Sequence, residues 1–257
     1  MNCDVTNPEQ APELIAELTH PNLGHSLSRP ALIKYRTRNS TGSYANPSEN
    51  RWLLVFGSGP TDLDSATSNQ DARIFAYDLN DRAWADDWST HPMEVNLASN
   101  AYVGDLSAAD WDNDYIDDAV YFGLNSGTIA SPDGRVARLR LRSDQAASGW
   151  VANASLGTLL NVDRNIVGRP LGKSDIYGRR WVTFGTGRLF TAADNASTQQ
   201  QYLYGVMEPV DSSFELTFGA VSHTDIYDVT NLAVSLAGVV DNGPTYTDGN
   251  GSSVTVN

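Results

Sequence analysis

Hydrophobic positions along the chain form short runs and do not follow the 3.6-residue period of helices. Most runs are rich in β-branched and aromatic residues and are separated by Gly, Asn, Asp, Ser and Pro. This pattern is typical of strands joined by turns. The best helical candidate, Pro12 to Leu18, is shorter than two turns and is treated as part of a lead-in segment. The pattern therefore predicts an all-β fold.

Three of these runs share one plan, in which a buried strand ends in Phe-Gly ahead of a turn. Their aromatic residues are Phe56, Phe122 and Phe184, which are 66 and 62 residues apart. A shorter run precedes each of them and an alternating run follows, so the same order of three strands occurs three times. In chain order the runs cover 29–36, 51–60 and 72–80, then 102–110, 118–128 and 135–143, then 167–172, 180–188 and 201–208.

A repeat of consecutive strands with this period is the sequence mark of β-propeller blades. Each blade is a small twisted sheet with two apolar faces, and it buries them by stacking against its neighbours. We expect a single β-propeller fragment with a lead-in at 1–24, blades at 25–92, 93–150 (with the aspartate loop) and 151–210, and a partial blade at 211–257. Three to four blades are visible, and propellers use about four to eight. Three blades do not close a ring, so either further blades are missing from the chain or the wheel closes differently. A β-sandwich with similar hairpins is the alternative.

The charge of the chain limits the partners to be expected. A formal net charge of −14 argues against nucleic acid, which needs a basic surface, and against docking on an anionic membrane. Cys3 is the only cysteine, so no internal disulfide or thiolate metal cluster is expected. No run has the roughly 18 apolar residues of a membrane helix. The N-terminus lacks the apolar core of a signal peptide, so for an exported protein we expect the signal to lie upstream.

The segment from Asp110 to Asp118 is where residue spacing specifies chemistry. Its carboxylates follow D-x-D-x-D-x-x-x-D, which matches positions 1, 3, 5 and 9 of an EF-hand-like loop. Alternate side chains of a tightly wound loop turn inward, and the carbonyl at position 7 adds another oxygen. The ligands predicted for Ca²⁺ are Asp110, Asp112, Asp114, the carbonyl of Ile116, and Asp118. An acidic, solvated turn without a metal is the plain alternative.

Two positions depart from the EF-hand pattern. Tyr115 stands at position 6, where Gly usually adopts a left-handed conformation, and a non-Gly residue there costs about 1–2 kcal/mol. Tyr121 replaces the bidentate Glu of position 12, which is expected where a strand follows the loop. We therefore expect a strand-flanked loop closed by Asp118, with modest calcium affinity. Asp117 should alternate away from Asp118 and is not counted as a ligand. Mg²⁺ fits less well because it tolerates irregular cages poorly.

Catalytic motifs are missing from the sequence. The four histidines lack metal-ligand spacing, and neither a G-x-S-x-G elbow nor a phosphate-binding loop is present. Ser58, between two glycines, is better explained by turn chemistry than as a nucleophile. Arg29 and Arg169 each precede Pro, and a role in turns competes there with a place along a central channel. We expect a non-enzymatic binding module, although the paired acids of a glycoside hydrolase leave no local signature and stay open.

Several segments taken together resemble a known family. They are LTHPNLGHSLSRPALIK (18–34), WLLVFGSGP (52–60), GDLSAADWDNDYIDDAVYFGLNSG (104–127), VTFGTGRLFTAAD (182–194) and YLYGVMEP (202–209). In this order they resemble the C-terminal propeller of the PilC/PilY group, from about residue 14 to 210. These proteins are type IV pilus biogenesis factors and tip-associated adhesins. The large N-terminal region of the family and several of its blades have no counterpart here, which implies a fragment.

The resemblance implies a propeller that binds Ca²⁺ through the loop ligands already named. It implies an extracellular protein on the pilus or the outer-membrane surface, with pilins or minor pilins and a host or surface ligand as partners. Calcium occupancy in this family is thought to govern pilus extension against retraction, and the protein supports attachment. No nucleic-acid partner and no direct membrane insertion are expected.

Other propellers remain as alternatives. Integrin-like FG-GAP propellers use a similar aspartate loop but repeat it in several blades, and the stretches near Asn39–Arg51 and Leu171–Arg180 lack it. A quinoprotein-like propeller would need cofactor-stacking Trp and a Cys pair. A propeller-fold glycoside hydrolase is the alternative from another functional class.

Overall fold

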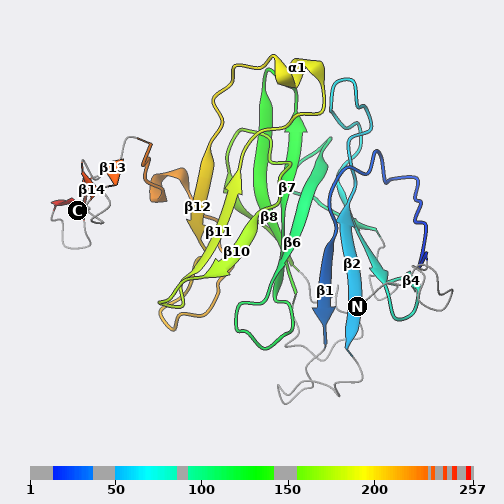
Figure 1. Ribbon diagram of the computed structural model, residues 1–257, viewed down its shortest axis with the longest axis horizontal. Coiled ribbons are helices and arrows are strands. Elements are labelled where there is room, and N and C mark those ends of the chain that lie inside the picture. The colour runs from blue at the N-terminus through cyan, green and yellow to red at the C-terminus, as the bar shows by residue number, and fades with distance from the viewer. Residues whose placement is uncertain are drawn as a thin grey trace, which may run out of the picture. The chain divides into compact units, whose positions relative to one another are not determined.

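The computed structural model describes residues 14–36, 50–85, 92–141 and 155–230, and the short segments 233–234, 240–241, 245–247 and 253–255. The chain divides into one compact unit up to Ala220 and a second from Val221 onward. The first unit contains three antiparallel sheets and, among its described residues, a single short helix, α1 (Ala192–Asn195) (Figure 1). The prediction of an all-β fold is confirmed.

Each sheet of the first unit is a meander of strands that follow one another in the chain. The first sheet has the order β1-β2-β3-β4, with β5 also paired to β3. Its strands are β1 (Ala31–Tyr35), β2 (Arg51–Gly57), β3 (Arg73–Asp78), β4 (Ala83–Trp84) and β5 (Met93–Glu94). The second sheet consists of β6 (Tyr102–Ala109), β7 (Ala119–Gly127), β8 (Pro132–Arg140) and β9 (Ser155–Asn161), and the third of β10 (Leu171–Ser174), β11 (Arg180–Gly185) and β12 (Leu203–Met207). The repeated order of three strands is therefore present in all three sheets.

The second sheet lies between the other two (Figure 1). All residues of β7 except Gly127 are buried, as expected of a strand covered on both faces. The main hydrophobic core lies between the first two sheets and includes Ile33, Ile74 and Phe122. The third sheet buries Val182, Phe184 and Val206. Stacking thus buries faces that a single sheet could not cover alone.

The repeated Phe-Gly pairs have a packing reason. A Cβ atom added to Gly57 would lie 2.2 Å from Cβ of Val103 in the second sheet. A Cβ atom at Gly123 would lie 1.8 Å from the carbonyl oxygen of Ile166, on the segment that leads to the third sheet. Glycine is therefore needed where the next sheet approaches the strand. At Gly185, the equivalent residue of the third sheet, no described atom lies within 4 Å of such a Cβ.

Some strands lie across the boundaries expected from the sequence. β5 lies beyond residue 92 and pairs with β3, and β9 lies beyond residue 150 and pairs with β8, so both belong to the preceding sheet. β10 begins at Leu171 instead of Val167. Pro170 has no amide hydrogen to donate, and the carbonyl of Val167 accepts from the amide of Asp105 in the second sheet. Within the part of the chain that the structure describes, the three sheets do not form a closed propeller.

The second unit, described by itself, has a short 3-10 helix η3 (His223–Asp225). Two small antiparallel pairs follow, β13 (Ala233–Val234) with β14 (Val240–Asp241) and β15 (Thr245–Thr247) with β16 (Ser253–Thr255). Of the expected lead-in, residues 1–13 lie outside the described part of the chain, and 14–18 are not helical. Within the described residues, no helix has the length and hydropathy needed to cross a lipid bilayer.

Candidate metal centre

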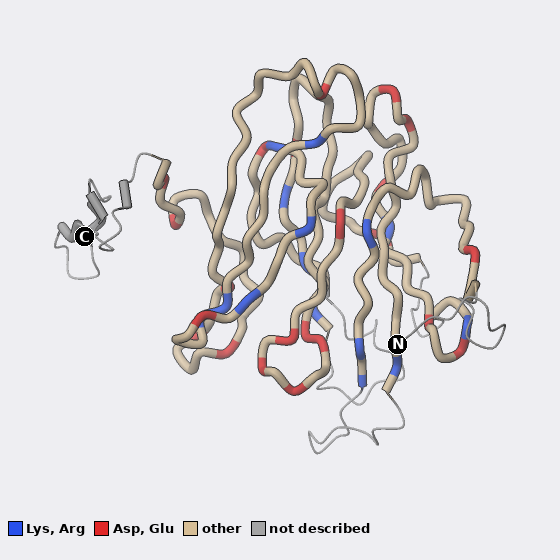
Figure 2. The backbone as a smooth tube through the Cα atoms, in the orientation of Figure 1, with Lys and Arg blue, Asp and Glu red and all other residues tan. Residues whose placement is uncertain are grey.

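The aspartate loop connects β6 to β7 at one end of the second sheet, and acidic residues are concentrated there (Figure 2). Its two ends are held together by strand pairing between Ala109 and Ala119. The amide of Asp118 also donates to the carbonyl of Ala109 over 2.8 Å. The loop therefore leaves and re-enters a rigid, buried pair of strands.

Backbone amides within the loop donate to its own carboxylates. Asp110 accepts from Asn113 through Oδ1 over 2.7 Å and from Tyr115 through Oδ2 over 2.8 Å. The amide of Asp114 donates to Oδ1 of Asp112 over 3.1 Å. Asn113 and Tyr115 have positive φ angles of 62° and 68°. Position 6 thus has the left-handed conformation expected of it, although Tyr is the residue present, and its side chain is 81% exposed.

The structure brings three of the four predicted carboxylates together. Oxygen atoms of Asp110, Asp112 and Asp118 all lie within 4.8 Å of one another. Ca²⁺ binds oxygens at about 2.3–2.6 Å, so ligands on opposite sides of one ion are about 4.6–5.2 Å apart. The spacing of these oxygens therefore fits a calcium ion.

Asp114 lies outside this close group of three. Its Oδ1 accepts a hydrogen bond of 2.8 Å from the amide of Ile116. The side chain of Ile116 is buried, with 1% of its surface exposed, and this burial holds the loop at that position. Asp114 and the carbonyl of Ile116 remain predicted ligands, and the close group by itself supplies fewer oxygens than the six to eight that Ca²⁺ takes.

Burial and neighbouring charges raise the pKa of two of these carboxylates, Asp118 and Asp112. Burial, followed by the neighbouring aspartate charges, raises the pKa of Asp118 from 3.8 to about 6, although the amide of Trp111 donates to its Oδ2 over 2.7 Å. Burial and the charge of Asp114 also raise the pKa of Asp112. A divalent cation among these oxygens would offset the repulsion and favour their ionised forms.

Two loop residues that the sequence did not mark as important fix the loop to its surroundings. Asp117 accepts through Oδ2 from the amide of Lys34 in β1, over 2.7 Å. The side chain of Trp111 is 4% exposed and donates from Nε1 to the hydroxyl of Tyr121. The only hint of these roles in the sequence is that both residues lie between predicted ligands. The local sequence does not show that Asp117 points to the first sheet or that Trp111 points toward the third.

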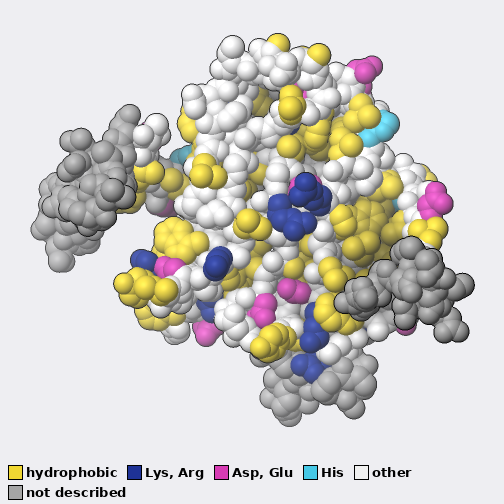
Figure 3. All heavy atoms as spheres, in the orientation of Figure 1, with side chains coloured by type: hydrophobic (Ala, Val, Ile, Leu, Met, Phe, Trp, Pro, Cys, Tyr) yellow, Lys and Arg dark blue, Asp and Glu magenta, His cyan; other side chains and the backbone are white. Residues whose placement is uncertain are grey.

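Two hollows on the described surface lie apart from the aspartate loop. One, of about 250 Å³, is lined by residues that include Arg29, Asp105 and Tyr102, and the other is about 120 Å³. Both are smaller than the roughly 300–1,000 Å³ of ordinary ligand pockets. Ser58 is buried, and its Oγ accepts from the amide of Arg73 at the start of β3, so its hydroxyl group joins two strands and does not belong to a turn. On the face drawn in Figure 3, Lys and Arg side chains form small separate groups.

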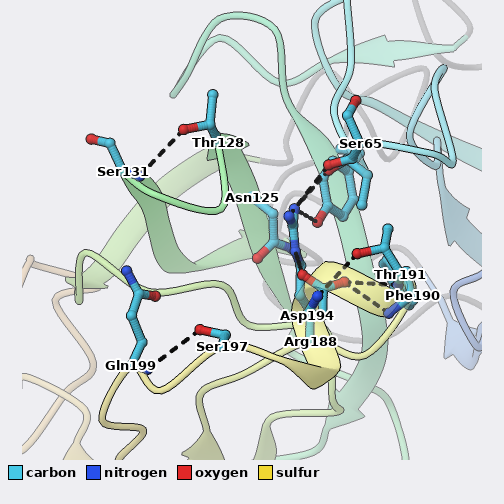
Figure 4. Close-up of polar contacts among 12 residues, drawn as sticks. Ser65, Asn125, Thr128, Ser131, Arg188, Phe190, Thr191, Asp194, Ser197 and Gln199 are labelled. Carbon is cyan, nitrogen blue, oxygen red and sulfur yellow. Dashed lines mark hydrogen bonds and ion pairs between the residues drawn. The ribbon is translucent and has the colours of Figure 1, made fainter.

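A buried ion pair lines the smaller hollow. Nε of Arg188 lies 2.7 Å from Oδ1 of Asp194, and both side chains are at most 4% exposed. The other nitrogens of Arg188 donate to the carbonyls of Ser65 and Ala66, over 3.3 and 2.7 Å (Figure 4). Oδ2 of Asp194 caps the amide of Thr191 at the start of α1. This arginine therefore ties the end of the third sheet to a loop of the first.

Comparison with known proteins gives a match among solved structures. No protein-family model and no curated protein matches the chain. A solved structure has a similar fold. It is the crystal structure of the Pseudomonas aeruginosa PilY1 C-terminal domain, with a TM-score of 0.60 and 19% sequence identity. The match covers 97% of this chain but 53% of the PilY1 chain, so this chain spans about half the length of that domain.

At this identity the likeness to the PilY1 domain shows a shared fold. It extends over nearly the whole chain.

Proposed function

We propose that this chain is a calcium-binding β-propeller module of a type IV pilus assembly and tip-adhesin protein. The observation that carries the proposal is the convergence of Asp110, Asp112 and Asp118 in a strand-bounded loop. That loop belongs to a chain with the fold of the PilY1 C-terminal domain. The role proposed is binding and regulation, without catalysis.

Sheet packing supports a propeller architecture. The first and third sheets flank the second, and Arg188 links the third sheet back to the first at one end. Gly57 and Gly123 each allow the next sheet to approach closely. At Gly185 the corresponding space beside the strand contains no described atom within 4 Å of an added Cβ. An architecture in which a further sheet follows the third accounts for this third glycine.

Calcium is the cation that the donor set fits best. The carboxylates of Asp110, Asp112 and Asp118 would hold it, and Asp114 and the carbonyl of Ile116 would complete the shell. The bound ion would supply positive charge where the loop has only negative charge. Hard oxygen ligands and an irregular loop favour Ca²⁺ over Mg²⁺.

A single such loop favours a pilus-type module over an FG-GAP propeller. The loop between β10 and β11, which corresponds to the aspartate loop in the repeat, is a short turn. There Asp175 binds Arg179 and the indole of Trp181. The other corresponding stretch, 37–49, lies outside the described residues.

The surface chemistry supports protein or surface partners. A net charge of −14 and the scattered basic groups of Figure 3 suit pilins, minor pilins or a host ligand better than nucleic acid. We place the protein outside the cell, on the pilus or outer-membrane surface, where free Ca²⁺ is in the range that loops of modest affinity bind.

Isothermal titration calorimetry with CaCl₂ tests the metal site. Wild-type protein should bind one calcium ion, and Asp110→Ala and Asp112→Ala should each lose this binding. Asp64→Ala removes an exposed carboxylate from another loop and serves as the matched control. Wild-type protein that gives no binding heat, and a melting temperature that excess chelator leaves unchanged, would falsify the calcium role.

A further inference from the structure

Trp111 lies between two predicted ligands, Asp110 and Asp112, but its side chain points away from the carboxylates and into the protein interior. Its backbone amide donates to Oδ2 of Asp118 over 2.7 Å, so the backbone of Trp111 is joined directly to a carboxylate of the close group. The indole itself is 4% exposed. One residue thus connects a carboxylate of the close group to a buried aromatic side chain.

The indole fills the space between the second and third sheets. A Cβ atom added to Gly172 of β10 would lie 2.8 Å from Cη2 and 2.9 Å from Cζ2 of Trp111. The indole also meets the ring of Tyr121 edge-on, with centroids 6.0 Å apart and planes at 80°. Its Nε1 donates to the hydroxyl of Tyr121 over 3.1 Å. Absence of a side chain at Gly172 is what allows this contact.

A chain of polar contacts continues from Tyr121 to the third sheet. The hydroxyl of Tyr121 donates to Oε1 of Glu208, which directly follows β12 and is fully buried. Oε2 of Glu208 lies 3.6 Å from Nη1 of Arg138, and Nη2 of Arg138 donates to the carbonyl of Gly219 over 2.8 Å. The amide of Glu208 is bonded to the carbonyl of Arg180 in β11. Polar groups buried this deeply have few alternative partners, so their arrangement is specific.

We propose that cation binding in the aspartate loop is coupled, through Trp111, to the packing of the third sheet on the second. This inference rests on the proposed calcium role and adds its regulation. Coupling between two sites is reciprocal. A change on the third sheet at Gly172, outside the predicted ligand set, must therefore alter the affinity of the loop for calcium.

Gly172→Ala tests this reciprocity, because its methyl group would displace the indole while no predicted ligand residue is substituted. Calorimetry should show calcium binding weakened by about fivefold or more, the lower end of ordinary coupling. Gly205→Ala in β12 is the matched control, since the nearest atom to its added Cβ is Cγ2 of Thr183 at 4.0 Å. Its affinity should equal that of wild type. Equal affinities for all three proteins would overturn the coupling.

Hydrogen exchange followed by mass spectrometry separates the coupling from the calcium role itself. In wild type, calcium should slow exchange in the loop 110–118 and also in β10, β11 and β12. Trp111→Phe keeps an aromatic ring but removes the indole N–H. In this variant calcium should still slow exchange in the loop 110–118 but should no longer slow it in β10, β11 and β12. Protection confined to the loop in wild type would overturn the coupling alone. If calcium protects no part of the wild-type protein, both the coupling and the calcium role fail.

Discussion

Asp117 and Lys34 are joined by two hydrogen bonds between the aspartate loop and the edge of the first sheet. The amide of Lys34 donates to Oδ2 of Asp117 over 2.7 Å, and the amide of Asp117 donates to the carbonyl of Lys34 over 3.0 Å. The next residue, Asp118, belongs to the close group of carboxylates. The two neighbouring aspartates thus have different roles. Asp117 binds the first sheet, and Asp118 contributes a carboxylate to the candidate metal site.

Substitution of Asp117 should therefore affect folding stability more than calcium binding. Asp117→Ala removes the acceptor of the Lys34 amide and should lower the free energy of unfolding by about 1–3 kcal/mol. Asp117→Asn keeps an acceptor oxygen and should lose much less. Urea denaturation without calcium measures the difference. Equal losses for the two variants would show that the charge of Asp117, and not its hydrogen bond, is what the fold uses.

Stability of the metal-free protein should depend on pH through the same two aspartates. Burial is the main cause that raises the pKa of Asp117 and of Asp118 to about 6, above the ordinary value of 3.8. The folded state then binds more protons than the unfolded state between these values. The stabilisation is complete below about pH 4 and is lost as pH rises through about 6.

Denaturation curves recorded between pH 4 and 7 check this direction. Saturating calcium should flatten or reverse the slope, because the ion favours ionised carboxylates and its affinity rises as protons leave. Asp118→Asn should reduce the slope in chelator. A metal-free protein that becomes more stable over this range would contradict the raised pKa values.

The strands and the position of the loop could be predicted because each depends on a pattern of neighbouring residues in the sequence. Alternating runs around Phe56, Phe122 and Phe184 marked the central strands, and the regular spacing of carboxylates marked the loop. The sequence could not predict that β9 belongs to the second sheet. A strand that follows a long connection is able to pair with the sheet before it or with the sheet after it. The position of Asp114 outside the close group depends on backbone amides whose directions the spacing does not give.

The buried contacts of Trp111, Glu208 and Arg188 were also beyond sequence reasoning. These contacts join residues that are far apart in the sequence and belong to different sheets. Tyr121 and Glu208, for example, are 87 residues apart. A lone Trp, Glu or Arg in a strand-rich sequence is compatible with many environments. The Phe-Gly repeat was visible, but its cause, the approach of the next sheet, became clear only from the three-dimensional packing.

The buried pair of Arg138 and Glu208 should be strongly coupled in stability. Burial lowers the pKa of Arg138 and raises that of Glu208, so each charge depends on the other. Arg138→Met should destabilise the protein by about 3–5 kcal/mol, because it leaves a buried carboxyl group without its counter-charge. Arg138→Met combined with Glu208→Gln should recover part of this loss, since the amide remains an acceptor for Tyr121. A double-mutant cycle in urea measures the interaction, and strictly additive losses would contradict it.

The three glycines of the Phe-Gly repeat should respond differently to the same substitution. Gly123→Ala would place Cβ 1.8 Å from the carbonyl oxygen of Ile166, so the segment leading to the third sheet must shift. Overpacking of this kind costs about 1–3 kcal/mol or more. Gly185→Ala meets no described atom within 4 Å and should be neutral or stabilising by up to about 1 kcal/mol. Thermal unfolding of the two variants compares them directly.

The same pair of variants also tests whether a further sheet packs next to the third. In a longer chain with an additional blade, Gly185 would face the approaching segment as Gly123 faces Ile166, and Gly185→Ala should then become as costly as Gly123→Ala. Tolerance of Gly185→Ala in both the 257-residue chain and a longer one would mean that the third Phe-Gly pair has a different cause. The packing argument for a propeller would then rest on the first two glycines alone.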